Sequence, residues 1–275
     1  MASMVLIAGR ATGKTLYMSL LTGPIELGGN WDAAAPNDVM AVINRMRTAC
    51  LHDVTLASDR QPEKLRVDDH TSGPPYIWLH TDNPTAGWII VDVRAQDWCN
   101  LAYQFGHELG HVFANSWQPD AVPANPSLWI EESLVEAFSL RGLAQLAIGW
   151  EQAPPFPDNA AYAASIRSYR ETILTRYQAL AQQEGRANGF AAWFRAHAQF
   201  FTEHGDLTAA RAAVPTMLTL LESDPKTLAD LGALNRWPGR SGIPLPDYLA
   251  HWSASCAELG TPGTLPARIN ELLNS

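Results

Sequence analysis

The fold is decided by one helical segment, residues 98–115, which reads WCNLAYQFGHELGHVFAN. Apolar residues recur in it at helical spacing, and this pattern predicts an amphipathic helix over Trp98–Asn115. Residues four apart share one face of a helix, so His107 and His111 can present both imidazoles to a single metal ion. Glu108 stands beside this pair. We therefore expect the segment to carry one half of a zinc site, with Glu108 facing the open position of the metal.

A second helix is expected over Ser127–Ile148, with Asn125 as its N-cap and Pro126 at its first helical position. A catalytic zinc ion usually takes three protein ligands and leaves one position for water. Glu132 shares a helix face with a second carboxylate one turn later, whereas Glu131 lies about 100° away around the helix. This spacing predicts Glu132 as the third ligand.

The second carboxylate on that face is Glu136, which lies among apolar neighbours. Histidines that bind a metal commonly donate their other ring N–H to a carboxylate, which fixes the tautomer. We expect Glu136 to play this part toward His107. Glu131, in contrast, fits an exposed acidic residue in the first turn, where the helix dipole favours negative charge.

Together, His107–His111 and the Trp129-Ile130-Glu131-Glu132 run resemble the gluzincins, the zinc metallopeptidases whose third ligand is a glutamate on a second helix. Thermolysin-like enzymes and HExxH-type aminopeptidases belong to this group, and the resemblance covers residues 88–140. It implies one zinc ion held by His107, His111 and Glu132, with Glu108 as the catalytic base. It also implies a peptide or protein as the substrate.

The chain lacks residues that are typical of three related groups of zinc enzymes. Ser133 stands where the aminopeptidases have glycine, and no Gly-x-Met-x-Asn element precedes the motif, so an aminopeptidase specificity is not supported. A metzincin would need glycine and histidine where the chain has Ala114 and Trp117. A deformylase would need a cysteine ligand in a Gly-Cys-Leu context, which neither Cys50 nor Cys99 has.

The expected chemistry is hydrolysis of a peptide bond. Zinc lowers the pKa of a bound water toward about 7, and Glu108 would accept its proton as the water attacks a carbonyl. In enzymes of this kind a tyrosine or histidine after the third ligand donates to the developing oxyanion. The candidates here are Tyr169, Tyr177, His197 and His204.

The fold class that follows is α+β and zincin-like, with a small N-terminal mixed sheet and a largely helical C-terminal part. Residues 1–95 are expected to form an α/β subdomain, and residues 96–275 the helical catalytic part, with the substrate between them. Trp88–Arg94 is expected to be an edge strand that pairs with a peptide, or alternatively a central strand buried on both faces.

Other expected elements follow from periodicity and turn residues, with Gly28-Gly29-Asn30 expected to be a turn or a loop. The expected strands are Thr15–Leu21, Val54–Ala57, Tyr76–His80 and Trp88–Val93, and an N-terminal helix is expected over Asn37–Cys50. Later helices are expected over Asn159–Glu184, Gly189–Glu203, Leu207–Glu222 and Asp247–Ala257, with a short one near the C-terminus.

Composition excludes several classes of function. Asp and Glu number 28 against 19 Lys and Arg, for a net charge of −9, and no basic cluster offsets this balance, so a nucleic-acid partner is not expected. No apolar run approaches the roughly 18–20 residues that span a membrane. The three cysteines, Cys50, Cys99 and Cys256, form no CxxC pair and predict neither disulfides nor a cysteine zinc site. The first residues do not read as a signal peptide, and a secreted or periplasmic location stays open if one was removed.

One motif competes with the zinc site. Ala8–Thr15 satisfies a relaxed Walker A pattern, and Asp92 could serve as a Walker B carboxylate. The first position is alanine and the βαβ alternation is not clear, which weakens this interpretation. Two alternatives therefore accompany the peptidase hypothesis: a nucleotide-binding protein of the P-loop type with an incidental HExxH, and a gluzincin-like binding module without catalysis. The oligomeric state is left open.

Overall fold

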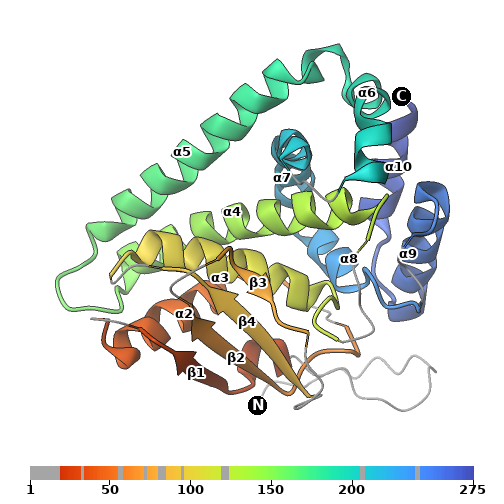
Figure 1. The fold of residues 1–275 in the computed structure, drawn as a ribbon. Helices are drawn as coiled ribbons and strands as arrows, with labels where there is room; N and C mark the ends of the chain where they lie inside the picture. The colour runs from red at the N-terminus through yellow and green to blue at the C-terminus, as the bar shows by residue number, and fades with distance from the viewer. Residues whose placement is uncertain are drawn as a thin grey trace, which may run out of the picture.

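The computed structural model describes residues 19–31, 34–54, 58–70, 73–79, 85–93, 96–118, 124–204, 208–238 and 242–275. The fold is α+β, as expected, with a small mixed sheet beside a larger set of helices (Figure 1). Within the described residues, no helix is both long and apolar enough to cross a membrane. The division at residue 95 stays a prediction.

The sheet contains β1 (Ile25–Gly29), β2 (Lys64–Asp69), β3 (Tyr76–Ile77) and β4 (Ala86–Val91), in the order β1-β2-β4-β3. β1, β2 and β4 run parallel, and β3 is antiparallel to β4. Helix α2 (Pro36–Cys50) lies between β1 and β2 in the chain and supplies the crossover that parallel strands require. Val67 and Ile89 are fully buried, so one face of the sheet belongs to the core.

The expectation of an edge strand at Trp88–Arg94 was wrong. β4 pairs with β2 on one side and β3 on the other, which is the central-strand alternative, and its buried residues Ile89, Ile90 and Val91 explain the continuous apolar run. The short β3 forms the edge on that side of the sheet, and β1 forms the other edge.

Two other expectations fail near the N-terminus. Gly28 and Gly29 form the end of β1 rather than a turn or a loop. A Cβ at Gly28 would lie 2.4 Å from Asp68, and a Cβ at Gly29 would lie 2.4 Å from the Asp69 backbone, so β1 can lie this close to β2 only with glycine at these positions. The described part of Thr15–Leu21 belongs to a short helix, α1 (Ser19–Thr22). Thr55–Ala57 of the expected strand Val54–Ala57 lies outside the described residues.

β2 was not anticipated, because charged and apolar residues alternate only over Lys64–Val67 and the strand ends in two aspartates. Its outward side chains form ion pairs: Lys64 lies 2.8 Å from Glu26 of β1, and Arg66 lies 2.8 Å from Asp68. Arg66 also covers the ring of Trp88 at 4.0 Å. Charged residues on this face are thus compatible with a strand whose other face is buried.

The remaining helices follow in chain order and mostly agree with the expected segments. They are α3 (Trp98–Phe113), α4 (Leu128–Gln152), α5 (Tyr162–Gln183), η1 (Arg186–Asn188), α6 (Phe190–Glu203), η2 (Ala209–Ala213), α7 (Val214–Ser223), η3 (Pro225–Thr227), α8 (Leu228–Gly232), α9 (Leu245–Leu259) and α10 (Thr264–Asn274).

Two helix boundaries differ from expectation. α4 begins at Leu128 with Ser127 as its N-cap, so Asn125 and Pro126, which are joined by a cis peptide bond, precede the helix. Leu207–Glu222 is not one helix but η2 followed by α7. Pro215, at the start of α7, has no N–H to continue a preceding helix and therefore favours a new start there.

Helices α3 and α4 lie side by side in the middle of the molecule (Figure 1). Glycines permit this approach. A Cβ at Gly110 would lie 2.8 Å from Cβ of Val135, and one at Gly106 would lie 2.8 Å from Oγ of Ser139. Because real Cβ atoms do not approach so closely, α3 can lie this near to α4 only with glycine at these positions.

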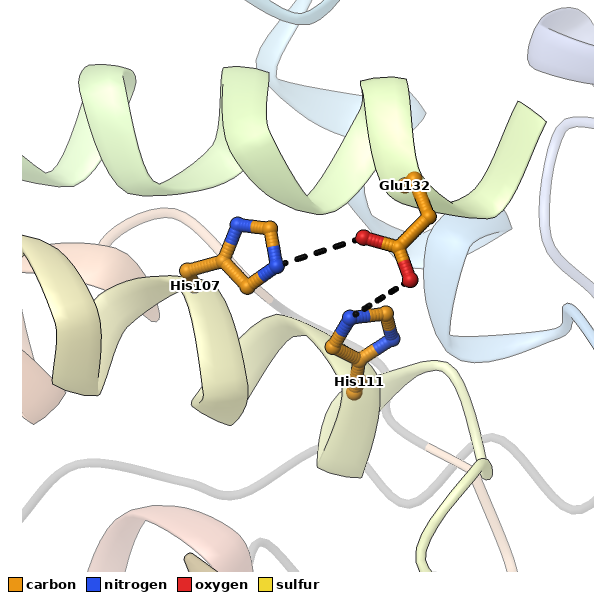
Figure 2. Close-up of side chains that lie close together, drawn as sticks. All are labelled: His107, His111 and Glu132. Atoms are coloured by element: carbon orange, nitrogen blue, oxygen red, sulfur yellow. Dashed lines mark ion pairs between the residues drawn. The ribbon is translucent and has the colours of Figure 1, made fainter. Parts of the chain in front are cut away.

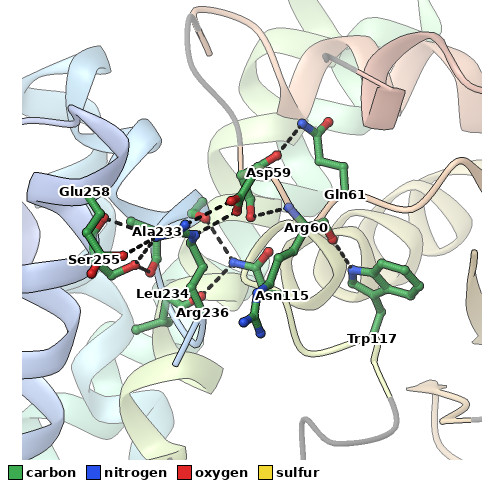
Figure 3. Close-up of polar contacts among 12 residues, drawn as sticks. Asp59, Arg60, Gln61, Asn115, Trp117, Ala233, Leu234, Arg236, Ser255 and Glu258 are labelled. Atoms are coloured by element: carbon green, nitrogen blue, oxygen red, sulfur yellow. Dashed lines mark hydrogen bonds and ion pairs between the residues drawn. The ribbon is translucent and has the colours of Figure 1, made fainter. Parts of the chain in front are cut away.

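The C-terminal helices are fastened to the end of α3 by polar contacts (Figure 3). Asn115, with a φ of 66°, donates to the carbonyls of Gly232 at 2.9 Å and Leu234 at 2.7 Å. Arg236 joins Asp59 at 2.9 Å to Oγ of Ser255 at 3.0 Å. Residues far apart in the sequence are thereby held around the C-terminal end of α3.

Candidate active site

Three side chains from two helices converge on one point (Figure 2). Nε2 of His107 lies 3.4 Å from Oε2 of Glu132, and Nε2 of His111 lies 3.4 Å from Oε1 of the same carboxylate. One ligand atom from each of the three residues lies within 4.8 Å of the others. The structure thus brings together the three residues that the sequence predicted as ligands.

The donor set fits zinc in chemistry and in size. Imidazole nitrogen and carboxylate oxygen are zinc ligands, and two such atoms bound tetrahedrally at about 2.1 Å stand roughly 3.4 Å apart. The two measured separations of 3.4 Å match that spacing. His107, His111 and Glu132 could therefore hold one zinc ion once their ligand atoms, which lie within 4.8 Å of one another, close in around it.

The far side of His107 is fixed by a buried carboxylate, as expected. Nδ1 of His107 lies 2.7 Å from Oε2 of Glu136. The other oxygen of Glu136 accepts hydrogen bonds from Tyr177, at 2.6 Å, and from Tyr103. Glu136 is thus saturated with donors, and its orientation fixes the ring of His107 so that Nε2 points to Glu132.

The far side of His111 is fixed in the same way, by a residue for which another role was expected. Glu131 is only 2% exposed, and its Oε1 lies 2.8 Å from Nδ1 of His111. Its Oε2 accepts from Nδ2 of Asn235 at 2.7 Å, and Asn235 in turn accepts from the Tyr248 hydroxyl at 2.8 Å. The expectation of an exposed Glu131 was therefore wrong, because the helix packs on α3 and on the segment after α8.

Glu108 differs from the other three carboxylates. Its residue is 3% exposed, yet its side chain lines the cavity beside the histidines. Among the described residues, none donates a hydrogen bond to it or pairs with it. The carboxylate is thus held at the site with its oxygens available to a bound molecule, which is the situation that a general base requires.

Burial and neighbouring charges shift the pKa values of this cluster. Burial lowers the pKa of His107, but hydrogen bonds to Glu132 and Glu136 outweigh it and raise the pKa to about 10. Burial would raise the pKa of Glu132, but the two histidines hold it far below its usual range. The site thus stabilises positive charge at the histidines, as a cation site does. Burial raises the pKa of Glu108, against the opposing effect of the histidines.

A cavity of about 510 Å³ opens over these groups. One part of its wall comes from the segment around β3, including Tyr76 and Ile77, and another from η2 and α7, including Ala210, Arg211 and Val214. Most of these residues are apolar. Arg211 is the one lysine or arginine among the described residues of the wall.

None of the four residues considered as oxyanion donors is part of this cavity wall. The Tyr177 hydroxyl donates to Glu136, which does line the cavity. Tyr169 donates to Asn100 at 3.2 Å. His197 bonds to the carbonyl of Trp193 at 2.9 Å and pairs with Glu184, and His204 is exposed.

Four residues with a place at the site were not anticipated: Tyr103, Glu131, Arg211 and Asn235. Tyr103 lies one turn before His107, so helical spacing alone could have placed it beside Glu136. Arg211 and Asn235 come from distant segments, and no local pattern links them to the motif.

A comparison of the chain with protein-family models, with curated proteins and with solved structures finds no match. The competing motif at Ala8–Thr15 lies outside the described residues. Asp92 is described, and its backbone N–H bonds to Gln104 at 2.8 Å.

Proposed function

We propose that this protein is a zinc-dependent peptidase that hydrolyses peptide bonds in a peptide or protein substrate. One observation carries the proposal: four carboxylates surround two histidines, and each carboxylate makes a different set of contacts. Glu132 faces both Nε2 atoms, Glu136 and Glu131 each hold an Nδ1 atom, and Glu108 alone has no donor among the described residues. A cluster that only stabilised the fold would not require one carboxylate between the histidines, two behind them and one without a donor.

His107, His111 and Glu132 would hold the zinc ion, which would supply Lewis acidity toward a carbonyl and lower the pKa of a water molecule. Glu108 accepts the proton from the attacking water and passes it to the leaving amine. Its buried setting, which raises its pKa, favours this exchange because the protonated form is then reached more easily. Glu136 and Glu131 keep the two imidazoles in the tautomer that leaves Nε2 free for the metal.

The cavity supports a peptide as the substrate. Its largely apolar wall can bury side chains, and β3 lies at the edge of the sheet within that wall. An exposed strand edge can bind an extended peptide through backbone hydrogen bonds. The edge-pairing role first expected for Trp88–Arg94 thus passes to β3.

The test compares the wild type with Glu108→Gln, both loaded with zinc. The variant is expected to hold the same amount of zinc, measured by metal analysis, and to cleave casein about 10²- to 10⁴-fold more slowly. Retention of zinc shows that the loss is not a folding defect. If the zinc-loaded wild type cleaves neither casein nor a peptide library, the catalytic proposal is wrong and the non-catalytic module becomes the better account.

A further inference from the structure

Arg211 occupies a distinctive position in the cavity that the proposed peptidase would use. It lies in η2, and its side chain lines the same cavity as Glu108, Glu132 and Glu136. It is exposed, and among the described residues its guanidinium has no hydrogen-bond or ion-pair partner. A cation in the wall of a largely apolar cavity is thus free to bind a ligand.

The backbone around Arg211 is firmly held. Its four neighbours in η2 are buried alanines, and its own N–H bonds to the carbonyl of Thr208 at 3.3 Å. Ala210 of η2 also lines the cavity, but Arg211 is the one residue of η2 with a long, charged side chain. The guanidinium therefore projects from a fixed base rather than from a freely moving loop.

Three of the four carboxylates of the site have partners other than Arg211, and among the described residues the fourth, Glu108, forms no ion pair with it. Glu136 accepts from two tyrosines and faces His107, Glu131 accepts from Asn235 and faces His111, and Glu132 faces both histidines. Burial raises the pKa of Tyr177, and the charge of Arg211 opposes that shift.

We propose that Arg211 determines specificity by binding a carboxylate group of the peptide substrate. A guanidinium can bind a carboxylate through two parallel hydrogen bonds, which gives both strength and orientation. The chain carries a net charge of −9 and would otherwise disfavour an anionic ligand, so a local cation has a clear effect. This proposal rests on the proposed function.

Two sources could supply the carboxylate: the free C-terminus of a short peptide, or an aspartate or glutamate side chain. Three acetylated probes separate them. The first is tetraalanine with a free C-terminus, the second is its C-terminal amide, and the third is the amide with one alanine replaced by glutamate. The amide without glutamate carries no carboxylate and is the reference for both sources.

Binding is measured by calorimetry with the zinc-loaded Glu108→Gln protein, which does not require turnover. We expect at least one carboxylate probe to bind about 10-fold more tightly than the reference amide. In the double variant with Arg211→Gln this preference disappears, and with Arg211→Glu it reverses. Arg268→Gln, an exposed arginine of α10 outside the cavity wall, is the matched control and keeps the preference.

Cleavage of the same probes by the protein with Glu108 intact completes the test. Arg211→Gln should raise KM for the carboxylate probe and leave kcat nearly unchanged, with zinc content equal to wild type. A carboxylate preference that survives in Arg211→Gln overturns the proposal. So does a fall in kcat that is equal for all three probes, or failure of all three to bind. Casein cleavage by the wild type separates these outcomes from failure of the peptidase proposal itself.

Discussion

Oε1 of Glu131 lies 2.8 Å from Nδ1 of His111, so the residue just before the expected ligand Glu132 holds the opposite side of the same imidazole. The adjacent glutamates therefore contact the two ring nitrogens of one histidine, Glu131 at Nδ1 and Glu132 at Nε2. Such outer partners orient the ligands of metal sites and raise their basicity. The buried chain of contacts continues through Asn235 to Tyr248, which ties His111 to the C-terminal helices.

Replacing Glu131 should weaken zinc binding without removing a ligand. We expect Glu131→Ala to lower zinc affinity about 10- to 100-fold, because His111 loses the acceptor that fixes its ring. Glu131→Gln keeps an acceptor oxygen and should lose less. Competition with a chromogenic chelator measures both affinities. Equal affinities for wild type and Glu131→Ala would show that the contact does not support the metal site.

Removing the Tyr177 hydroxyl should show whether this group only orients Glu136 or also donates to the oxyanion. Tyr177→Phe deletes one donor to Glu136, while Tyr103 still donates to the same oxygen. We expect less than a roughly 10-fold loss of kcat, whereas loss of an oxyanion donor costs about 10²- to 10³-fold. Steady-state kinetics on casein-derived peptides make the measurement. A loss in the larger range would place the Tyr177 hydroxyl at the reacting carbonyl.

The close approach of α3 and α4 should depend on Gly110. In Gly110→Ala the new methyl group would lie 2.8 Å from Cβ of Val135, so the helices must separate and the histidines must move away from Glu132. We expect loss of zinc affinity together with a lower free energy of unfolding. Gly149→Ala is the matched control within α4, because nothing lies within 4 Å of the added methyl group.

The control should stabilise the protein slightly, by at most about 1 kcal/mol, because alanine has the higher helix propensity. Urea unfolding and chelator competition on both variants test this pair. If Gly110→Ala binds zinc as tightly as Gly149→Ala, the spacing of the two helices does not set the site.

Asn115 should contribute to stability rather than to chemistry. Asn115→Ala removes the donor from two buried carbonyls, those of Gly232 and Leu234, and should lower the free energy of unfolding by about 1–3 kcal/mol. Thermal and urea unfolding measure the change. Zinc content at temperatures well below the transition should equal that of wild type, and a lost metal with unchanged stability would contradict this assignment.

The sequence predicted the α+β class and the central helix pair, because their signals are local, whereas the zincin-like fold stays a prediction. The stripe of apolar residues around His107 and the i,i+4 spacing of Glu132 and Glu136 depend only on helix geometry, and the structure brings the same residues together. Their chemical roles stay predictions, which the variants described above test.

What sequence reasoning missed depends on long-range packing. Whether Glu131 is exposed is decided by Asn235, more than a hundred residues away, and whether β4 is an edge is decided by pairing with the two-residue β3. Arg211 enters the cavity because η2 packs beside α4 and α5. The periodicity of apolar residues does not predict contacts between segments that are distant in the sequence.

Zinc titration tests the central claim most directly. The wild type is stripped with a chelator, and casein cleavage is followed as zinc is added back to it and to Glu132→Ala. We predict no cleavage without metal, full recovery of the wild type at one equivalent of zinc, and neither tight zinc binding nor recovery in Glu132→Ala. Cleavage that persists in the metal-free wild type, or one tightly bound zinc in Glu132→Ala with full activity, would contradict the account.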